Sequence, residues 1–239
     1  MTRSGVTRSR VIRVAVVDYG AGNLVSIEQA LTAAGADVVM ARDPRAFSGA
    51  DALVVPGVGA AAPAMSRLRR CGLDEPIRAW IADGRPLLGI CLGLQLLFEG
   101  SDEDGAETLG VLPGRTVRLE DAPRLPHIGW NQVERRRAHP LFEGIDDAAD
   151  FYFVHSYAAA PGPDADTLKL AETTHGARFV SAIARGPLAG VQFHPERSGR
   201  DGLRLLANFV GLAAAGVAAS ASGVATPAPG AWRQPAMAG

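Results

Sequence analysis

The sequence feature that most constrains the fold is an apolar run, residues 86–97, that is interrupted by one cysteine. The run reads as a short buried strand followed by an apolar helix over about 92–98, with Cys91 at the junction. Gly89 and Gly93 flank the cysteine as G-x-C-x-G, the thiol counterpart of the G-x-S-x-G turn that exposes a nucleophile. The spacing therefore predicts a tight strand-to-helix turn with the sulfur projecting clear of a sheet.

The thiol itself has two readings. The N-terminal end of the following helix points its N–H groups and positive dipole end at the sulfur, which favours the thiolate. A lone cysteine in an apolar run is, however, more often a buried small hydrophobe. A catalytic role needs a base and a third group that other parts of the chain supply.

A histidine and a glutamate about a hundred residues downstream could supply them. The apolar segment 188–193 predicts a strand, and His194 and Glu196 follow it as His-Pro-Glu. A histidine at a strand end can reach a nucleophile on a neighbouring strand, and Glu196 can accept the other imidazole N–H and fix the tautomer. Together with Cys91, these residues are the predicted catalytic triad.

Other readings of the histidines stay open. His155 ends an aromatic strand and is a rival base, but no carboxylate lies near it in the sequence. His-x-Glu could also be half of a metal site, or a surface histidine beside a helix-capping glutamate. A tetrahedral metal site would need more ligands than this constellation offers, so no metal is predicted.

The remaining apolar segments predict the fold class. Short, nearly all-apolar runs are typical of strands buried on both faces of a parallel sheet, and here they alternate with segments of helical spacing. We therefore expect an α/β fold with a mostly parallel central sheet flanked by helices and a small antiparallel extension. The strand segments that carry this expectation are 11–17, 38–40, 53–55, 111–119, 168–172 and 179–184.

Composition indicates which partners and which cellular compartment the chain favours. The chain has 239 residues, is 47% hydrophobic and has a formal net charge of −1. That balance does not favour binding to nucleic acid or to an anionic membrane. Two cysteines, Cys71 and Cys91, do not make a disulfide framework, which fits a reducing cytoplasm. The sequence contains no run of eighteen apolar residues, so we predict no membrane span.

The chain ends differ in composition from the centre. Residues 1–10 are polar and lack the apolar core of a signal peptide, so we expect a disordered extension. Residues 11–212 are the predicted globular domain, whose last helix is expected over 202–212. Residues 213–239 are rich in Ala, Gly, Ser and Pro, which is typical of a disordered or loosely helical tail.

The two catalytic motifs together resemble those of class I glutamine amidotransferases. Two further segments are similar to the glutaminase subunits of imidazole glycerol phosphate synthase. They are Tyr-Gly-x-Gly-Asn at residues 19–23 and Pro-His-x-Gly-Trp-Asn at residues 126–131. The resemblance covers residues 12–211, and it implies the fold of that family and a reaction without a cofactor.

The resemblance also implies binding residues. One N–H of an oxyanion hole would come from Val58 or Gly59 and the other from Leu92. Gln95 lies at i+4 from Cys91, so its amide could bind substrate, and the family has a glutamine-binding residue there. The remaining residues implied are Ser156 and Tyr157 for the glutamine, and Asn23, Trp130, Asn131 and Arg197 for the partner interface. Gly199 departs from a second serine that is frequent in the family, which puts hydrogen bonds from this loop to substrate in doubt.

The function implied by the resemblance is hydrolysis of L-glutamine to glutamate and ammonia. The ammonia would pass to a (β/α)8 cyclase subunit in a heterodimer, which makes imidazole glycerol phosphate and aminoimidazole carboxamide ribotide in histidine biosynthesis. The nearer alternative is the glutaminase of anthranilate, aminodeoxychorismate, pyridoxal phosphate or GMP synthase. The more distant alternatives are a non-catalytic binding module and a thiol peptidase on the same fold.

Overall fold

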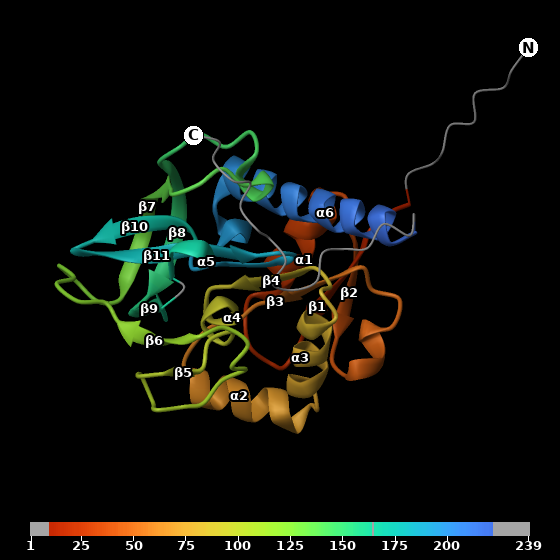
Figure 1. Ribbon diagram of the computed structural model, residues 1–239, viewed down its shortest axis with the longest axis horizontal. Coiled ribbons are helices and arrows are strands. Elements are labelled where there is room, and N and C mark those ends of the chain that lie inside the picture. The colour runs from red at the N-terminus through yellow and green to blue at the C-terminus, as the bar shows by residue number, and fades with distance from the viewer. Residues whose placement is uncertain (1–9, 164, 222–239) are drawn as a thin grey trace, which may run out of the picture.

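A computed structural model describes residues 10–163 and 165–221, and its centre is a run of five parallel strands (Figure 1). In spatial order these strands are β2 (Asp37–Ala41), β1 (Arg13–Val17), β3 (Ala52–Val55), β4 (Leu87–Ile90) and β12 (Leu188–Val191). Each pairs in parallel with its neighbour. Every residue of β3, β4 and β12 is buried, because helices cover both faces of this part of the sheet.

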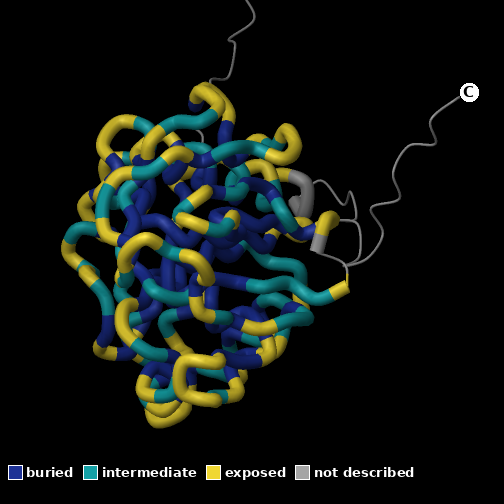
Figure 2. Tube along the Cα trace, turned by 90° about the vertical axis from the view of Figure 1, so that its left-hand side faces the viewer, coloured by how far each residue is buried: buried dark blue, intermediate teal, exposed yellow. Residues whose placement is uncertain are grey.

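Two helical layers produce that burial. On one face α1 (Leu24–Ala33) packs beside α6 (Gly199–Ala221). On the other face α2 (Ala61–Arg70) is followed by α3 (Asp74–Ala82), and Figure 1 shows the two pairs on opposite sides of the sheet. The buried side chains accordingly form two apolar clusters, one on each face, and Figure 2 shows this interior enclosed by exposed loops.

The sheet continues beyond β12 with antiparallel strands. The next strands in order are β11 (Ala177–Arg185), β10 (Lys169–His175), β7 (His127–Arg135) and β8 (Ala149–His155). Three further strands lie off this path: β5 (Gly100–Ser101), β6 (Gly114–Arg118) and β9 (Tyr157–Pro161). β9 pairs with both β11 and β6, and β5 pairs with β6. The predicted α/β class, with a parallel centre and an antiparallel extension, is confirmed.

The remaining elements are short. The predicted helix over 92–98 is wrong in length, because α4 spans only Leu92–Gln95 before the chain turns. Four residues form one turn, so tertiary contacts and not helix propensity hold this segment. The other short helices are α5 (Ala165–Leu168) and the 3₁₀ turns at Pro44–Phe47, Pro140–Phe142 and Pro195–Arg197.

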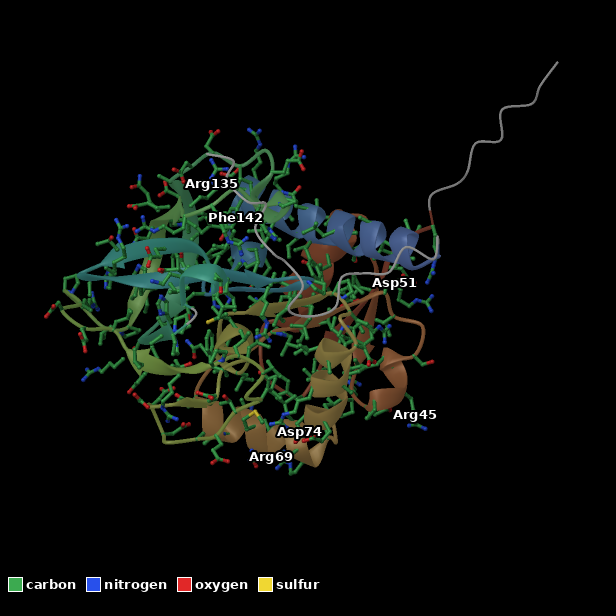
Figure 3. The ribbon with its side chains drawn as sticks, viewed as in Figure 1. Arg45, Asp51, Arg69, Asp74, Arg135 and Phe142 are labelled. Carbon is green, nitrogen blue, oxygen red and sulfur yellow. The ribbon has the colours of Figure 1, made fainter. Side chains whose placement is uncertain are left out.

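The ends of the domain differ in part from the expectation. Arg10 is the first described residue, and its guanidinium forms an ion pair at 2.8 Å with the buried carboxylate of Asp51. Figure 3 labels Asp51. At the other end, the expected stop of the last helix at 212 is wrong, because α6 continues to Ala221. Alanine has the highest helix propensity, and Ala213 is fully buried against the core. Residues 1–9 and 222–239, which include most of both predicted disordered ends, lie outside the described residues.

Candidate active site

Cys91 follows β4 directly and stands at the start of α4 in a strained backbone conformation. Its φ is +54° and its ψ is −111°, a region that a residue with a Cβ rarely adopts. Such strain costs on the order of 1–3 kcal/mol and persists only where the surroundings enforce it. The Cys91 N–H donates to the Val191 carbonyl at 2.8 Å, which ties the turn to the end of β12.

The two flanking glycines let this turn form. A Cβ on Gly93 would overlap the carbonyl oxygen of Val55, and a Cβ on Gly89 would lie 2.7 Å from the carbonyl oxygen of Gly93. β3 and the α4 backbone are therefore in direct contact. The G-x-C-x-G spacing thus reflects close backbone approach on both sides of the cysteine.

His194 and Glu196 lie next to this turn because β12 pairs with β4. Val191 is in register with Ile90, so the residues that follow the two strands share one edge of the sheet. The His194 Nδ1 and the Glu196 Oε1 are 2.8 Å apart, and both side chains are almost fully buried. The His194 main-chain N–H donates to the Tyr152 carbonyl of β8 at 2.8 Å, and Ser198 Oγ donates to the His194 carbonyl at 2.6 Å.

The environment of His194 favours its protonated form. Burial by itself lowers the pKa of His194, but interactions with the nearby Cys91 sulfur and with Glu196 outweigh burial and raise the pKa to about 10. Nδ1 is committed to Glu196, while Nε2 has no hydrogen-bond partner among the described residues. Nε2 is therefore the atom that remains for proton exchange with the sulfur and with a substrate.

The sulfur itself has two polar neighbours at hydrogen-bond distance. Cys91 Sγ lies 3.9 Å from the Val154 carbonyl oxygen, an acceptor for a thiol proton. Gln192 Nε2 donates to Sγ at 3.6 Å. Gln192 was not among the residues that sequence reasoning singled out, although it is the one polar side chain in the predicted strand over 188–193.

The loop that was expected to carry half of an oxyanion hole lies beside His194. Asn23 and Val58 line one crevice together with Ile90, His194 and Glu196. Val58 is 47% exposed, and Gly59 has a φ of +86°, so the loop turns there in a conformation that favours glycine. Leu92 is the first residue of α4, directly after Cys91, and its Cβ would lie 2.9 Å from a Cβ on Gly57 of this loop.

Tyr19 holds the loop of residues 56–59 in place through a hydrogen bond. The Tyr19 hydroxyl donates to the Pro56 carbonyl at 2.9 Å, and burial raises the pKa of Tyr19 above its ordinary value. A Cβ on Gly57 would lie 2.5 Å from this hydroxyl. The Tyr-Gly-x-Gly-Asn segment thus fixes the loop that carries Val58, a structural role that the motif alone does not reveal.

The predicted glutamine-binding residues are only partly together. Gln95 is buried, and its Nε2 donates to the Tyr157 carbonyl at 2.8 Å and to Gln192 Oε1 at 3.0 Å. Ser156 and Tyr157 are partly exposed at the junction of β8 and β9. The Tyr157 side chain lines a separate hollow with Asp102 and Glu120. The structure therefore joins Gln95 to Tyr157 through the main chain of Tyr157.

The predicted partner residues divide into two groups. Trp130 is 58% exposed and packs edge-on against Tyr152, whose ring also carries the Arg197 guanidinium at 4.2 Å. These three residues form an exposed aromatic and cationic surface. Asn131 points the other way, because its Nδ2 lies 3.1 Å from His127 Nε2 and donates to the Thr174 carbonyl at 2.9 Å.

His155 is poorly placed to act as the base. Its Nδ1 donates to the Tyr157 carbonyl at 2.9 Å, and its Nε2 lies 3.1 Å from His127 Nδ1. Burial lowers the pKa of His155 to about 3, so the imidazole stays neutral near pH 7. Both ring nitrogens are occupied by structural hydrogen bonds, which leaves His194 as the imidazole next to the thiol.

Two further observations bear on earlier questions. Within the described ranges, no group of three or more His, Cys, Asp or Glu side chains is placed to hold a metal ion. Gly199 opens α6 with a φ of +57°, a conformation that a serine at this position would adopt only with strain.

A strained cysteine elbow on a parallel sheet, beside a buried histidine–glutamate pair, defines a thiol-dependent class I amidotransferase site. The family model Glutamine amidotransferase class-I matches residues 15–212. A solved glutamine amidotransferase from Thermotoga maritima shares the fold with a TM-score of 0.60 at 17% identity, covering 91% of this chain and 87% of that chain.

The curated relatives are more specific. Imidazole glycerol phosphate synthase subunit HisH of Symbiobacterium thermophilum is 50% identical over 198 residues, 82% of this chain and 92% of that protein. Subunit HisH of Thermococcus kodakarensis is 51% identical over 203 residues, 82% of this chain and 98% of that protein. The chain belongs to the class I glutamine amidotransferases and, within them, to the family of HisH subunits.

Proposed function

We propose that this chain is the glutaminase subunit of an imidazole glycerol phosphate synthase and acts in histidine biosynthesis. It hydrolyses L-glutamine to glutamate and ammonia with Cys91 as nucleophile, His194 as acid and base, and Glu196 as the group that orients His194. The observation that carries the proposal is the buried His194–Glu196 pair at 2.8 Å beside a cysteine held at φ +54°. Identity to HisH subunits of about half the residues supports the choice of pathway.

The mechanism follows from these positions. The side-chain amide of glutamine lies over the sulfur, and the Cys91 thiolate attacks its carbon while His194 holds the proton. The developing oxyanion is stabilised by the N–H of Leu92 and by that of Val58 or Gly59, each worth on the order of 3 kcal/mol in the barrier. Since the pKa of His194 is about 10, its imidazolium persists at neutral pH and protonates the leaving nitrogen.

The second half of the reaction uses the same residues in reverse. Ammonia departs and leaves a thioester between the sulfur and the glutamate acyl group. His194, now neutral, removes a proton from a water molecule that attacks the thioester carbon. Glu196 accepts the Nδ1–H throughout, which keeps Nε2 as the exchanging atom.

The ammonia needs an acceptor held close by, because ammonia that escapes into water is protonated and is no longer a nucleophile. The partner in this proposal is a (β/α)8 cyclase subunit in a heterodimer. The Trp130, Tyr152 and Arg197 surface supports a docking site, since exposed aromatic and arginine side chains are enriched at protein interfaces. Asn23 lines the same narrow crevice as His194, which supports an interface close to the proposed catalytic residues.

The compartment in this proposal is the cytoplasm, with both cysteines free. Cys71 and Cys91 form no disulfide in the described structure. Helix α6 is long and apolar enough to cross a membrane by length and composition. Its residues Leu205, Leu206 and Phe209 are buried in the core of the domain, so we assign it to the fold.

The test compares two cysteine variants in the reconstituted pair. Cys91→Ala removes the nucleophile, so we expect glutamine-dependent synthesis to vanish while ammonia-dependent synthesis by the cyclase remains. Cys71→Ala changes the other thiol, which is half-buried at the end of α2, and both reactions should persist. Normal glutamine turnover by Cys91→Ala would refute the assignment. Retrieval of another synthase by this chain from a lysate would instead favour the glutaminase of a different pathway.

A further inference from the structure

The mechanism leaves a group of buried polar side chains unused, and they form one continuous hydrogen-bonded chain. It begins at the sulfur, where Gln192 Nε2 donates to Cys91 Sγ at 3.6 Å. Gln192 is fully buried, and its Oε1 accepts from Gln95 Nε2 at 3.0 Å. Because Gln95 supplies a donor, the oxygen of the Gln192 amide faces Gln95 and the nitrogen faces the sulfur.

The series of hydrogen bonds continues through a main-chain carbonyl to two histidines. The Tyr157 carbonyl accepts from Gln95 Nε2 at 2.8 Å and from His155 Nδ1 at 2.9 Å. With its proton on Nδ1, His155 uses Nε2 as an acceptor for His127 Nδ1, at 3.1 Å. His127 Nε2 then accepts from Asn131 Nδ2 at 3.1 Å. One set of tautomers satisfies every one of these contacts.

The two histidines keep this arrangement near neutral pH. Burial lowers the pKa of His155 to about 3 and, together with the charge of His175, lowers the pKa of His127 to about 4. Both rings are therefore neutral in the working range, and neither nitrogen changes its role. His127 also stacks on His175 with ring centroids 4.0 Å apart, which holds its plane.

The two polar neighbours of the sulfur act in opposite directions. The Val154 carbonyl can only accept a proton from sulfur, so it stabilises the thiol. The Gln192 amide N–H can only donate to sulfur, and such a bond is stronger when the sulfur carries charge. Gln192 thus supplies a hydrogen-bond donor to the Cys91 thiolate in the position that the strained turn gives the sulfur.

We infer that Gln192 is a positioning residue for Cys91: its amide holds the sulfur as a nucleophile, and the Gln95, His155 and His127 chain fixes the orientation of that amide. The inference rests on the proposed glutaminase reaction. It assigns Gln192 no contact with substrate. Its loss should therefore change the reactivity of the sulfur and leave glutamine affinity nearly unchanged.

The first experiment replaces Gln192 in the complex with the cyclase subunit. Gln192→Leu removes both hydrogen bonds at similar volume, and Gln192→Glu keeps an acceptor for Gln95 while turning a carboxylate toward the sulfur. We expect kcat for glutamine to fall about tenfold or more in both variants, the loss expected for a hydrogen bond to a charged group. KM should stay within about twofold, because only the reactivity of the sulfur changes.

A second measurement needs neither glutamine nor the partner. In a Cys71→Ala background, iodoacetamide reports Cys91 alone, and its alkylation should slow in Gln192→Leu by a factor similar to the fall in kcat. Even if the wild-type chain had no glutaminase activity, the alkylation rate would still show whether Gln192 controls the reactivity of the Cys91 sulfur. Ser181→Ala is the matched control, since its buried hydroxyl has no hydrogen-bond partner within the described residues and its carbonyl accepts the Gln192 N–H.

The far end of the hydrogen-bonded series is tested with a pair of variants at His127. His127→Phe keeps the aromatic stack and loses the donor to His155, so kcat should fall about threefold. His127→Asn places an amide N–H where Nδ1 stood, and should recover most of that loss. Thermal denaturation and the Kd for the cyclase subunit measure folding and docking in every variant. A Gln192→Leu enzyme with unchanged kcat and alkylation, or one whose KM alone rises, overturns the inference.

Discussion

Gly93 is the position where the structure predicts the largest effect from the smallest change. A Cβ at Gly93 would overlap the Val55 carbonyl oxygen and lie 2.8 Å from the Val55 carbonyl carbon. These atoms belong to the backbone of β3, which is in register with β4 from Leu53 to Val55. No side chain can rotate away, so Gly93→Ala must separate α4 from a central strand.

The magnitude follows from that obstacle. Overpacking a core by a methyl group costs about 1–3 kcal/mol, and more where relief requires backbone movement. We take about 3 kcal/mol for Gly93→Ala, which corresponds to a fall of roughly 6–12 °C in Tm for a chain of this size. The same displacement moves the N–H of Leu92, the proposed oxyanion donor, and loss of such a donor lowers kcat by about 10²–10³.

The assay pairs thermal denaturation with glutamine turnover and includes the same substitution elsewhere. Gly211 lies exposed in α6, and a Cβ there meets no atom within 4 Å. Gly211→Ala should stabilise the chain by about 1 kcal/mol through helix propensity, with unchanged turnover. Equal Tm shifts for the two variants, or a Gly93→Ala enzyme that melts and turns over like the wild type, would refute the reasoning.

Three further outcomes follow from the site. Glu196→Gln removes the charge that orients His194, so kcat in steady-state kinetics should fall by on the order of 10³–10⁴. Tm should fall as well, because the buried His194 imidazolium loses its charged partner. Trp130→Ala should raise the Kd for the cyclase about 30-fold in a titration, the loss of an aromatic hot spot, with stability within about 0.5 kcal/mol of the wild type. The third outcome concerns pH. The pKa values of His155 and His127 are about 3 and 4 in the folded chain and near 6.5 unfolded, so the unfolded chain binds more protons between these values. The contribution of these two rings to the free energy of unfolding in urea should therefore be complete above pH 6.5 and decline as the pH falls toward 4. His194, whose pKa is raised to about 10, contributes with the opposite sign, and its contribution declines as the pH rises from 6.5 toward 10. A profile with no decline below pH 6.5 would contradict the burial of the two rings.

The fold was predictable where one local pattern has one structural meaning. All-apolar segments such as those that form β3 and β4 can be strands only in a sheet covered on both faces, and this sufficed for the parallel centre. The cysteine turn was predictable for a related reason. Gly89 and Gly93 flank a single polarisable side chain in an apolar run, and the backbone contacts at Gly93 account for that spacing.

The ends of helices were harder to predict, because they depend on what lies beside them. The composition of residues 213–221 is also found in disordered segments, yet α6 continues through it since Ala213 packs on the core. The segment after Cys91 shows the opposite case. Its apolar residues suggested a helix over 92–98, but tertiary contacts end α4 after one turn at Gln95.

The role of Gln192 could not be found from sequence, because three separate segments build its surroundings. Gln95 and Gln192 are 97 positions apart, and the sulfur and Gln192 are 101 positions apart. Their contact depends on the register of β12 against β4. A polar residue inside an apolar strand was the available signal, since burial of an amide is costly unless both of its ends are bonded.

The antiparallel extension explains why the exposed surface of Trp130, Tyr152 and Arg197 lies close to the proposed catalytic residues. In β8, the Tyr152 carbonyl accepts the His194 N–H, while the ring of the same tyrosine packs between Trp130 and Arg197. Two residues along the strand, the Val154 carbonyl contacts the Cys91 sulfur. One strand therefore has main-chain carbonyls against both proposed catalytic residues and the Tyr152 side chain on the surface proposed for the cyclase. In the proposed reaction, ammonia must reach the partner before water protonates it. The pairing of β7 with β8, which sets Trp130 beside Tyr152, would keep the docking surface close to the sulfur.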